Sequence, residues 1–149
     1  MCAECEECQK LRSSLQREPL EADDLPKRPF DSVSADLFQI GNKHYLAYAD
    51  RLSGYPLVNC WMKVPTSAQV IKEVREYFSL FGKPLKFRSD GGGQFDSGEM
   101  HAFLQEFCVE HGKSAPHHPQ SNGHAERNVK ILRDLLKKTG NDIYQLICK

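Results

Sequence analysis

The chain has 149 residues, of which 40% are hydrophobic and 27% are charged, and its 20 basic residues balance its 20 acidic ones. This length is typical of one globular domain with a short extension. No run approaches the roughly 18 consecutive apolar residues that a membrane span needs, and the polar first thirty residues lack the apolar stretch of a signal peptide. We therefore expect a soluble intracellular protein without a membrane partner. Its six cysteines should be reduced, since three crowd the N-terminus and three stand singly.

The neutral average conceals two ends of opposite sign. Residues 1–24 carry seven acidic and three basic side chains, whereas residues 113–149 carry seven basic and three acidic ones. We therefore expect any polyanion to bind the C-terminal third of the chain.

The first half of the sequence predicts a linker followed by three strands. Residues 12–29 are polar and contain three prolines, so they predict an extended linker, with the folded domain beginning near Phe30. Alternating residues 32–40 and the segment 43–50 are separated by a Gly-Asn turn and predict a hairpin. A third strand, rich in β-favouring residues, starts at Tyr55. Three antiparallel strands follow from this pattern.

Helices alternate with short strands in the second half. A capping box at Thr66 and Gln69 begins a helix with one apolar stripe, which ends at Gly82. A short apolar strand then ends at Asp90, before three glycines. Further helices are expected from Asp96 to His111–Gly112, from about Asn122 to Thr139, and over 142–148, with a short segment at 113–116 between the first two. The order predicts a mixed α/β domain with helices covering a central sheet.

Several side chains have an ordinary structural interpretation. Cys60, Cys108 and Cys148 fall on apolar faces and are expected in the core. Phe38 and Trp61 could stack on a base, but core packing is expected for them as well. Asp50 lies at a turn and is expected to stabilise it.

Three carboxylates stand in positions that favour a catalytic role. Asp36 lies inside the first strand, on the face opposite Val33 and Ala35; Asp90 ends a strand; and Glu126 begins a helix. If that helix packs across the sheet, the three could converge, and such a cluster binds hard divalent ions such as Mg²⁺ or Mn²⁺. Taken singly, each has a structural alternative: an edge-strand or turn aspartate for Asp36, an Asx turn for Asp90, and an i,i+4 ion pair with Lys130 for Glu126.

The spacing and flanks of these residues resemble a known family. Thirty-five residues separate Asp90 from Glu126, within the flanks FRSDGGGQF and HHPQSNGHAER. Together with SADLF and YLAYADRLSGY, these motifs resemble the catalytic core of retroviral-type integrases, over about residues 30–136. The sequences of these motifs are most similar to those of integrases of Gypsy-type LTR retrotransposons and their host-domesticated descendants.

The resemblance implies an RNase H-like fold, whose mixed central sheet has three antiparallel strands and two short parallel strands and is flanked by helices. It implies a catalytic triad of Asp36, Asp90 and Glu126 holding two Mg²⁺ or Mn²⁺ ions, 3′ end processing and strand transfer of DNA, and a homodimer or higher homo-oligomer. It also implies a nuclear location, or one within a virus-like particle. By the same resemblance, the residues that contact DNA are Lys130, Arg133, Asn122, Gln120 and His117.

The N-terminal segment resembles half of the zinc-binding domain of the same family. Cys5 and Cys8 match its Cys-x-x-Cys end, but the histidine pair is absent from this sequence. Zinc would therefore be held only if that pair were supplied from elsewhere. We divide the chain into a zinc-domain remnant (1–11), a linker (12–29) and a catalytic core that is shortened at its C-terminus (30–149).

Two other functions remain open from the sequence. A domesticated descendant could have lost DNA cleavage and serve as a DNA-binding or protein-interaction module, which the missing flanking domains favour. A nuclease of the same fold could use water alone as the attacking group.

Overall fold

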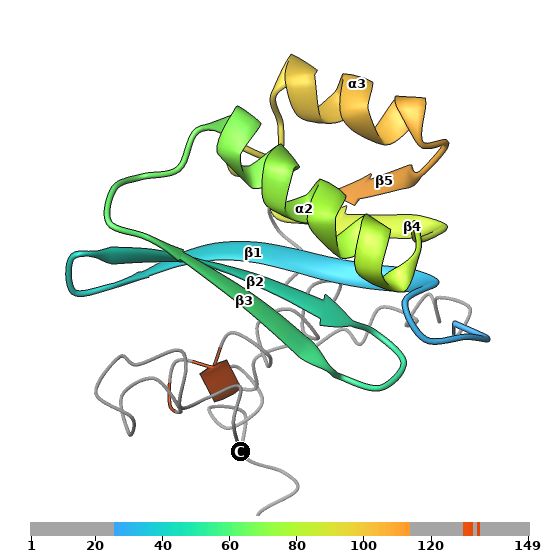
Figure 1. Cartoon of the computed structure of the whole chain (residues 1–149), viewed down its shortest axis with the longest axis horizontal. Coiled ribbons are helices and arrows are strands. Elements are labelled where there is room, and N and C mark those ends of the chain that lie inside the picture. Colours follow the sequence, from blue (N-terminus) through green and yellow to red (C-terminus); the bar gives the residue numbers. More distant parts are fainter. Residues whose placement is uncertain (1–25, 114–129, 133, 135–149) are drawn as a thin grey trace, which may run out of the picture.

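The computed structural model describes residues 26–113, 130–132 and 134. They form a five-stranded mixed sheet with helices, in the strand order β3-β2-β1-β4-β5. Figure 1 shows the helices labelled α2 and α3 on one face of the sheet and residues 130–132 and 134 on the other. The elements are β1 (Ser32–Ile40), β2 (Lys43–Asp50), β3 (Pro56–Trp61), α2 (Ser67–Phe81), β4 (Lys86–Ser89), α3 (Gly98–Glu106) and β5 (Glu110–Lys113).

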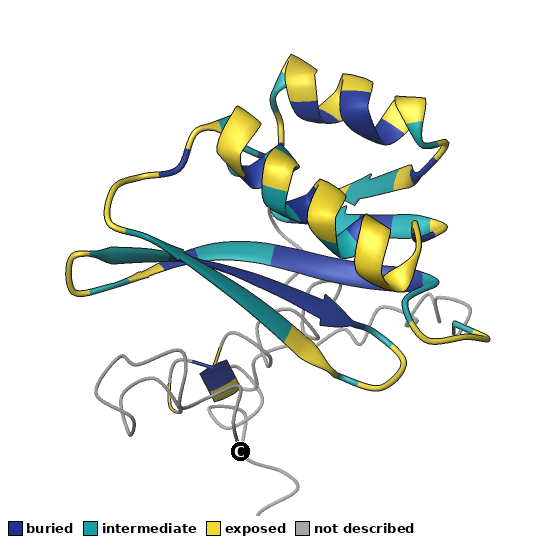
Figure 2. Cartoon of the chain, viewed as in Figure 1, coloured by how far each residue is buried: buried dark blue, intermediate teal, exposed yellow. Residues whose placement is uncertain are grey.

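The sheet confirms the expected α/β fold class. β1, β2 and β3 pair antiparallel, whereas β4 pairs parallel to β1 and β5 parallel to β4. β1 lies at the centre of the strand order, and its first residues, Ser32–Ala35, are buried (Figure 2).

Alternation along β1 divides the core into two parts. Val33 and Ala35 point toward α2 and α3 and are fully buried there with Phe87 of β4. Phe38 points to the other face, where it packs with Tyr45, Ala47 and Leu132. Leu132 is 2% exposed, so the helical segment that carries it covers the second face of the sheet.

Local signals place α2 as the sequence predicts. The Thr66 side chain accepts a hydrogen bond from Gln69 N, and Gln69 Oε1 accepts one from Thr66 N, so both halves of the capping box form. Gly82 ends the helix at φ +89°, a conformation that strains any residue with a Cβ.

The predicted end of the second helix and the predicted burial of Cys108 are both wrong. The helix is capped by Ser97 and ends at Glu106, and His111 and Gly112, which were expected to end it, lie in strand β5. A four-residue strand has too little alternation to be recognised, and it forms because its backbone pairs with β4. Cys108 is exposed, since its φ of +52° turns the chain away from the apolar stripe of α3. Cys60 is half-buried, Trp61 is partly buried against the core, and Cys148 lies outside the described residues.

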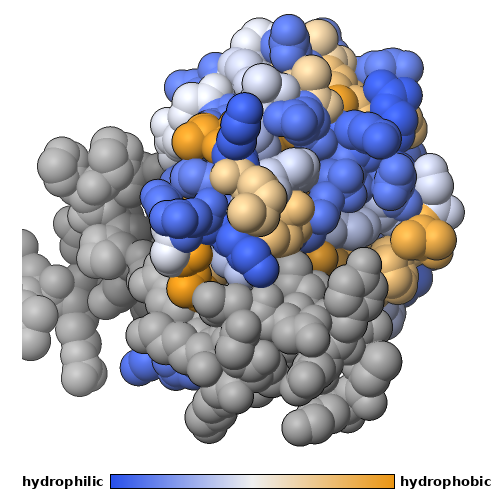
Figure 3. All heavy atoms as spheres, turned by 60° about the vertical axis from the view of Figure 1, so that its left-hand side comes forward, coloured by the Kyte–Doolittle hydropathy of each residue, from blue (hydrophilic) through white to orange (hydrophobic). Residues whose placement is uncertain are grey.

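The surface mixes polar and apolar residues. On the face in Figure 3, hydrophilic residues dominate and apolar ones form small patches between them. None of the helices within the described ranges is long and apolar enough to cross a membrane.

Candidate active site

The parallel pairing of β1 and β4 brings two carboxylates together. Ser34 pairs with Arg88 and Ala35 with Ser89, so continuing the register by one residue places Asp36 beside Asp90. Neighbouring strands lie about 4.8 Å apart, and partners in register point to the same face. The two carboxylates therefore share one face, close to the carboxyl end of β4.

That face is the one covered by the helical segment at Leu132. Asp36 pairs with Ala47 across β1 and β2, and Ala47 packs in the same cluster as Phe38 and Leu132. Asp36 is half-buried, as is Asp90. The carboxylate pair thus lies on the opposite side of the sheet from α2 and α3.

Gly92 orients the Asp90 side chain. Its N–H donates to Asp90 Oδ1 at 3.1 Å, which is the Asx-turn bond that the structural alternative predicts. A Cβ on Gly92 would lie 3.0 Å from the same oxygen, whereas a Cβ on Gly91 or Gly93 would meet nothing within 4 Å. Of the three glycines only Gly92 would bring a Cβ into close approach, and the group it approaches is the Asp90 carboxylate itself.

The other sequence-predicted residues fall into two groups. Lys130 is exposed on the helical segment that carries Leu132. Glu126, Arg133, Asn122, Gln120, His117, Cys5 and Cys8 lie outside the described residues. Within the described ranges no three His, Cys, Asp or Glu side chains form a group that could hold a metal ion, so the third ligand of a metal site would come from elsewhere in the chain.

Asp50 has the structural role expected of it. Its carboxylate is fully buried and accepts hydrogen bonds from Phe30 N (2.8 Å), Leu52 N (3.3 Å), and Ser53 N and Oγ (2.9 and 2.7 Å). Burial alone would raise the pKa of Asp50, but these bonds lower it below the ordinary value. Asp50 therefore joins the start of β1 to the turn after β2.

Comparison with known proteins identifies the family. No family model matches the sequence. The chain is 35% identical over 91 residues to the Gag-Pro-Pol polyprotein of human T-cell leukemia virus 2 (HTLV-2), a match that covers 61% of this chain and 6% of the polyprotein. It is 29% identical over 144 residues to the Pro-Pol polyprotein of feline foamy virus, which covers 90% of this chain and 12% of that one.

A solved integrase structure is similar to this chain in both fold and sequence. The HTLV-2 integrase catalytic core domain, in complex with magnesium and in a dimeric form, matches with a TM-score of 0.62 and 27% identity, over 80% of this chain and 75% of that one. The chain belongs with the retroviral-type integrase catalytic cores. Its five-stranded mixed sheet flanked by helices is the RNase H-like fold of those cores.

Sequence reasoning missed two residues at the carboxylate site of this integrase core. Arg88 is half-buried and two residues before Asp90, so it shares the face of the carboxylates. Phe87 and Ser89 are buried on the face under α2 and α3, and Arg88 alternates to the opposite face. That alternation could have predicted that Arg88 lies on the face of the carboxylates. The particular role of Gly92 had no such signal, because three consecutive glycines look alike in a sequence.

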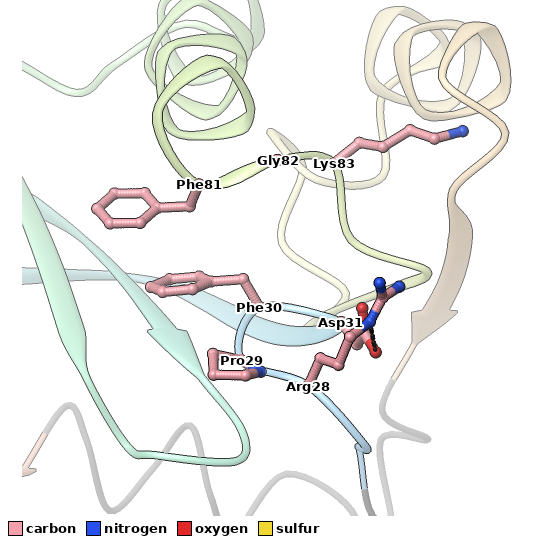
Figure 4. Close-up of a pocket in the computed structure, with 7 residues that line it drawn as sticks. All are labelled: Arg28, Pro29, Phe30, Asp31, Phe81, Gly82 and Lys83. Carbon is pink, nitrogen blue, oxygen red and sulfur yellow. Dashed lines mark hydrogen bonds and ion pairs between the residues drawn. The ribbon is translucent and has the colours of Figure 1, made fainter.

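A cavity of this integrase core lies away from the carboxylates. It has a volume of about 410 Å³ and is lined by residues at the start of β1 and the end of α2 (Figure 4). Phe30 stacks on Phe81 with ring centroids 4.4 Å apart, and Arg28 pairs with Asp31 (Figure 4). Asp31 precedes β1 and its carbonyl accepts from the N–H groups of Leu85 and Lys86, so the cavity lies at the amino ends of β1 and β4. It is therefore not part of the carboxylate site.

Proposed function

We propose that this chain is the catalytic core of a Gypsy-type retrotransposon integrase, or of a host gene derived from one, and that it catalyses metal-dependent 3′ end processing and strand transfer of DNA. The observation that carries the proposal is the register of β1 and β4, which sets Asp36 beside Asp90 on one face. In the sequence, Glu126 stands six residues before Leu132, which packs on that same face of the sheet. This short separation supports Glu126 as the third member of the triad.

The carboxylate pair fits a divalent metal ion. Two like charges on neighbouring strands repel each other, and a cation between them relieves that repulsion. Carboxylate oxygens are the donors that Mg²⁺ and Mn²⁺ prefer. Magnesium in the HTLV-2 core supports the same ion here. Asp36, Asp90 and Glu126 would together hold two ions.

The chemistry would be an in-line displacement at a phosphodiester. The bound ions would activate the attacking oxygen and stabilise the leaving oxygen. Asp36 is fixed by the central strand, and Asp90 Oδ1 is held by the Gly92 N–H, so both donors are oriented before substrate arrives. Water attack would trim the element's DNA ends, and attack by the resulting 3′ hydroxyls would join them to target DNA.

The contact at Gly92 gives a matched test of this orientation. Gly92→Ala places a Cβ 3.0 Å from Asp90 Oδ1, so the carboxylate must move, and we expect the dissociation constant for Mn²⁺ to rise about tenfold. Gly93→Ala has open space and should leave that constant unchanged. Titration calorimetry with Mn²⁺ measures both variants. Equal constants would show that the position of the Asp90 side chain does not govern metal binding.

The basic residues of the C-terminal third would bind DNA phosphates. Lys130 is exposed beside the buried Leu132, and Arg133 follows it in the sequence. We expect Lys130→Ala with Arg133→Ala to weaken DNA binding and to flatten the slope of log K against log salt by about 1.8, for two lost phosphate contacts. Fluorescence anisotropy at several salt concentrations checks this. An unchanged slope would place the DNA elsewhere. Asn122, Gln120 and His117 are proposed as further DNA contacts.

The test of the proposed function is strand resolution. A branched DNA that mimics an integration product is incubated with the chain in Mn²⁺, because this reverse reaction asks least of flanking domains. Joined product from the wild type and none from Asp90→Asn is the expected result. A folded wild-type chain that binds DNA but yields no product would instead indicate a domesticated binding module. Hydrolysed product without joined product would indicate a nuclease.

Partners and location follow as proposals. The dimeric form of the HTLV-2 core supports a homodimer here, with DNA as the second partner. A nuclear location, or one inside a virus-like particle, fits this activity. The zinc-domain remnant at Cys5 and Cys8 stays a prediction, because it lies outside the described residues.

A further inference from the structure

Strand β5 contacts both ends of the loop that begins with Asp90. This loop, residues 90–97, is called the Asp90 loop. At its start, Ser89 Oγ and His111 Nε2 are joined by a hydrogen bond of 2.8 Å. At its end, Asp96 accepts from Lys113 Nζ and from His101 Nε2, the latter at 3.1 Å. His111 and Lys113 both belong to β5, so one short strand contacts Ser89, directly before the loop, and Asp96 near its end.

The hydrogen bond between Ser89 and His111 is part-buried. The Ser89 residue is 0% exposed, and a buried hydroxyl without a partner destabilises the folded state. His111 is fixed on two sides, with its ring centroid 5.8 Å from that of Phe87 and 5.2 Å from that of His101. Burial, followed by the charges of His101 and Lys113, lowers the pKa of His111, so the ring is neutral near pH 7. The ring therefore holds one defined position against Ser89.

The backbone pairing at this place is short. β4 and β5 have four residues each, and β5 is an edge strand. Few backbone hydrogen bonds hold so short an edge strand, so side-chain hydrogen bonds contribute much of what keeps it in place. Ser89 is the residue directly before Asp90, and a shift of Ser89 shifts Asp90 against Asp36.

We propose that His111 is a positioning residue for Asp90, acting through its hydrogen bond with Ser89 while Lys113 and His101 hold the far end of the loop at Asp96. This inference rests on the proposed function, in which Asp90 binds a metal ion. His111 does not touch the metal or the DNA in this proposal. It keeps the Asp90 carboxylate in register with that of Asp36.

Four variants test the bond. Ser89→Ala and His111→Leu remove it, whereas His111→Gln places an amide group at the reach of Nε2 and should retain it. His44→Leu, in β2, which β1 separates from β4, is the matched histidine control. The readout is the dissociation constant for Mn²⁺ from titration calorimetry, measured well below the melting temperature of each variant without metal. A loss of folding stability alone does not change this constant under those conditions.

We expect the constant to rise about tenfold in Ser89→Ala and His111→Leu, and to stay within about threefold of the wild type in His111→Gln and His44→Leu. The double variant Ser89→Ala with His111→Leu should bind Mn²⁺ with the same dissociation constant as either single variant, because both substitutions remove the same hydrogen bond. Unchanged constants in both single variants, with a wild type that binds Mn²⁺, would overturn this inference alone. A wild type that binds no Mn²⁺ would overturn the proposed metal site and this inference with it.

Discussion

Asp90→Asn and Asp36→Asn are each expected to abolish the stabilisation of the chain by Mg²⁺ or Mn²⁺. A ligand at a hundred times its dissociation constant stabilises the folded state by about 2.7 kcal/mol. For a chain of this length that raises the melting temperature by roughly 5–10 °C. Each variant removes a negative oxygen donor from the carboxylate pair, and in the metal-free state it also relieves repulsion between neighbours.

The measurement is thermal unfolding with and without metal. Glu99→Gln is the control, since Glu99 is exposed at the start of α3, on the other face of the sheet. It should keep the full metal-dependent shift. An equal shift in Asp90→Asn and the wild type would mean that the ion binds elsewhere, and the proposed triad would be wrong.

Among the substitutions proposed for this chain, Asp50→Ala is expected to lower the free energy of unfolding the most. The variant leaves three backbone N–H groups and the Ser53 hydroxyl without their acceptor. It also frees Phe30, whose φ of +62° is unfavourable for a residue with a side chain. Hydrogen bonds to charged groups contribute about 1.5–3 kcal/mol each and do not add fully, so we expect a loss of about 3 kcal/mol or more in unfolding free energy.

Urea unfolding measures this loss, and Glu76→Ala on the exposed face of α2 is the control, expected within about 0.5 kcal/mol of the wild type. The effect of Asp50 also depends on pH. Its hydrogen bonds hold its pKa below the ordinary value of 3.8, so its contribution is complete above that value and disappears as pH falls through the lower pKa of the folded state. The difference between wild type and Asp50→Ala should thus shrink in acid. A difference that stayed constant down to pH 2 would contradict this role.

Local patterns predicted the elements whose signals lie within a few residues. The alternation of β1 and the capping box of α2 are examples, because each signal is formed by residues that touch within the element itself. The second short parallel strand was expected from the family resemblance, but the residues that form it, those of β5, were not predicted, for the opposite reason. Its four residues become a strand only through pairing with β4, and His111 gained its partner Ser89 by that pairing.

The candidate site divides in the same way. The family, the candidates Asp36 and Asp90, and the structural role of Asp50 could be predicted, because motif spacing and turn chemistry are properties of the chain. The position of Asp36 beside Asp90, on the face covered by Leu132, came from the fold. So did the contact between Gly92 and the Asp90 carboxylate, and the contacts of β5 with Ser89 and Asp96. Parallel pairing joins strands that are distant in the sequence, and which side chains it brings into contact depends on a register that no local pattern records.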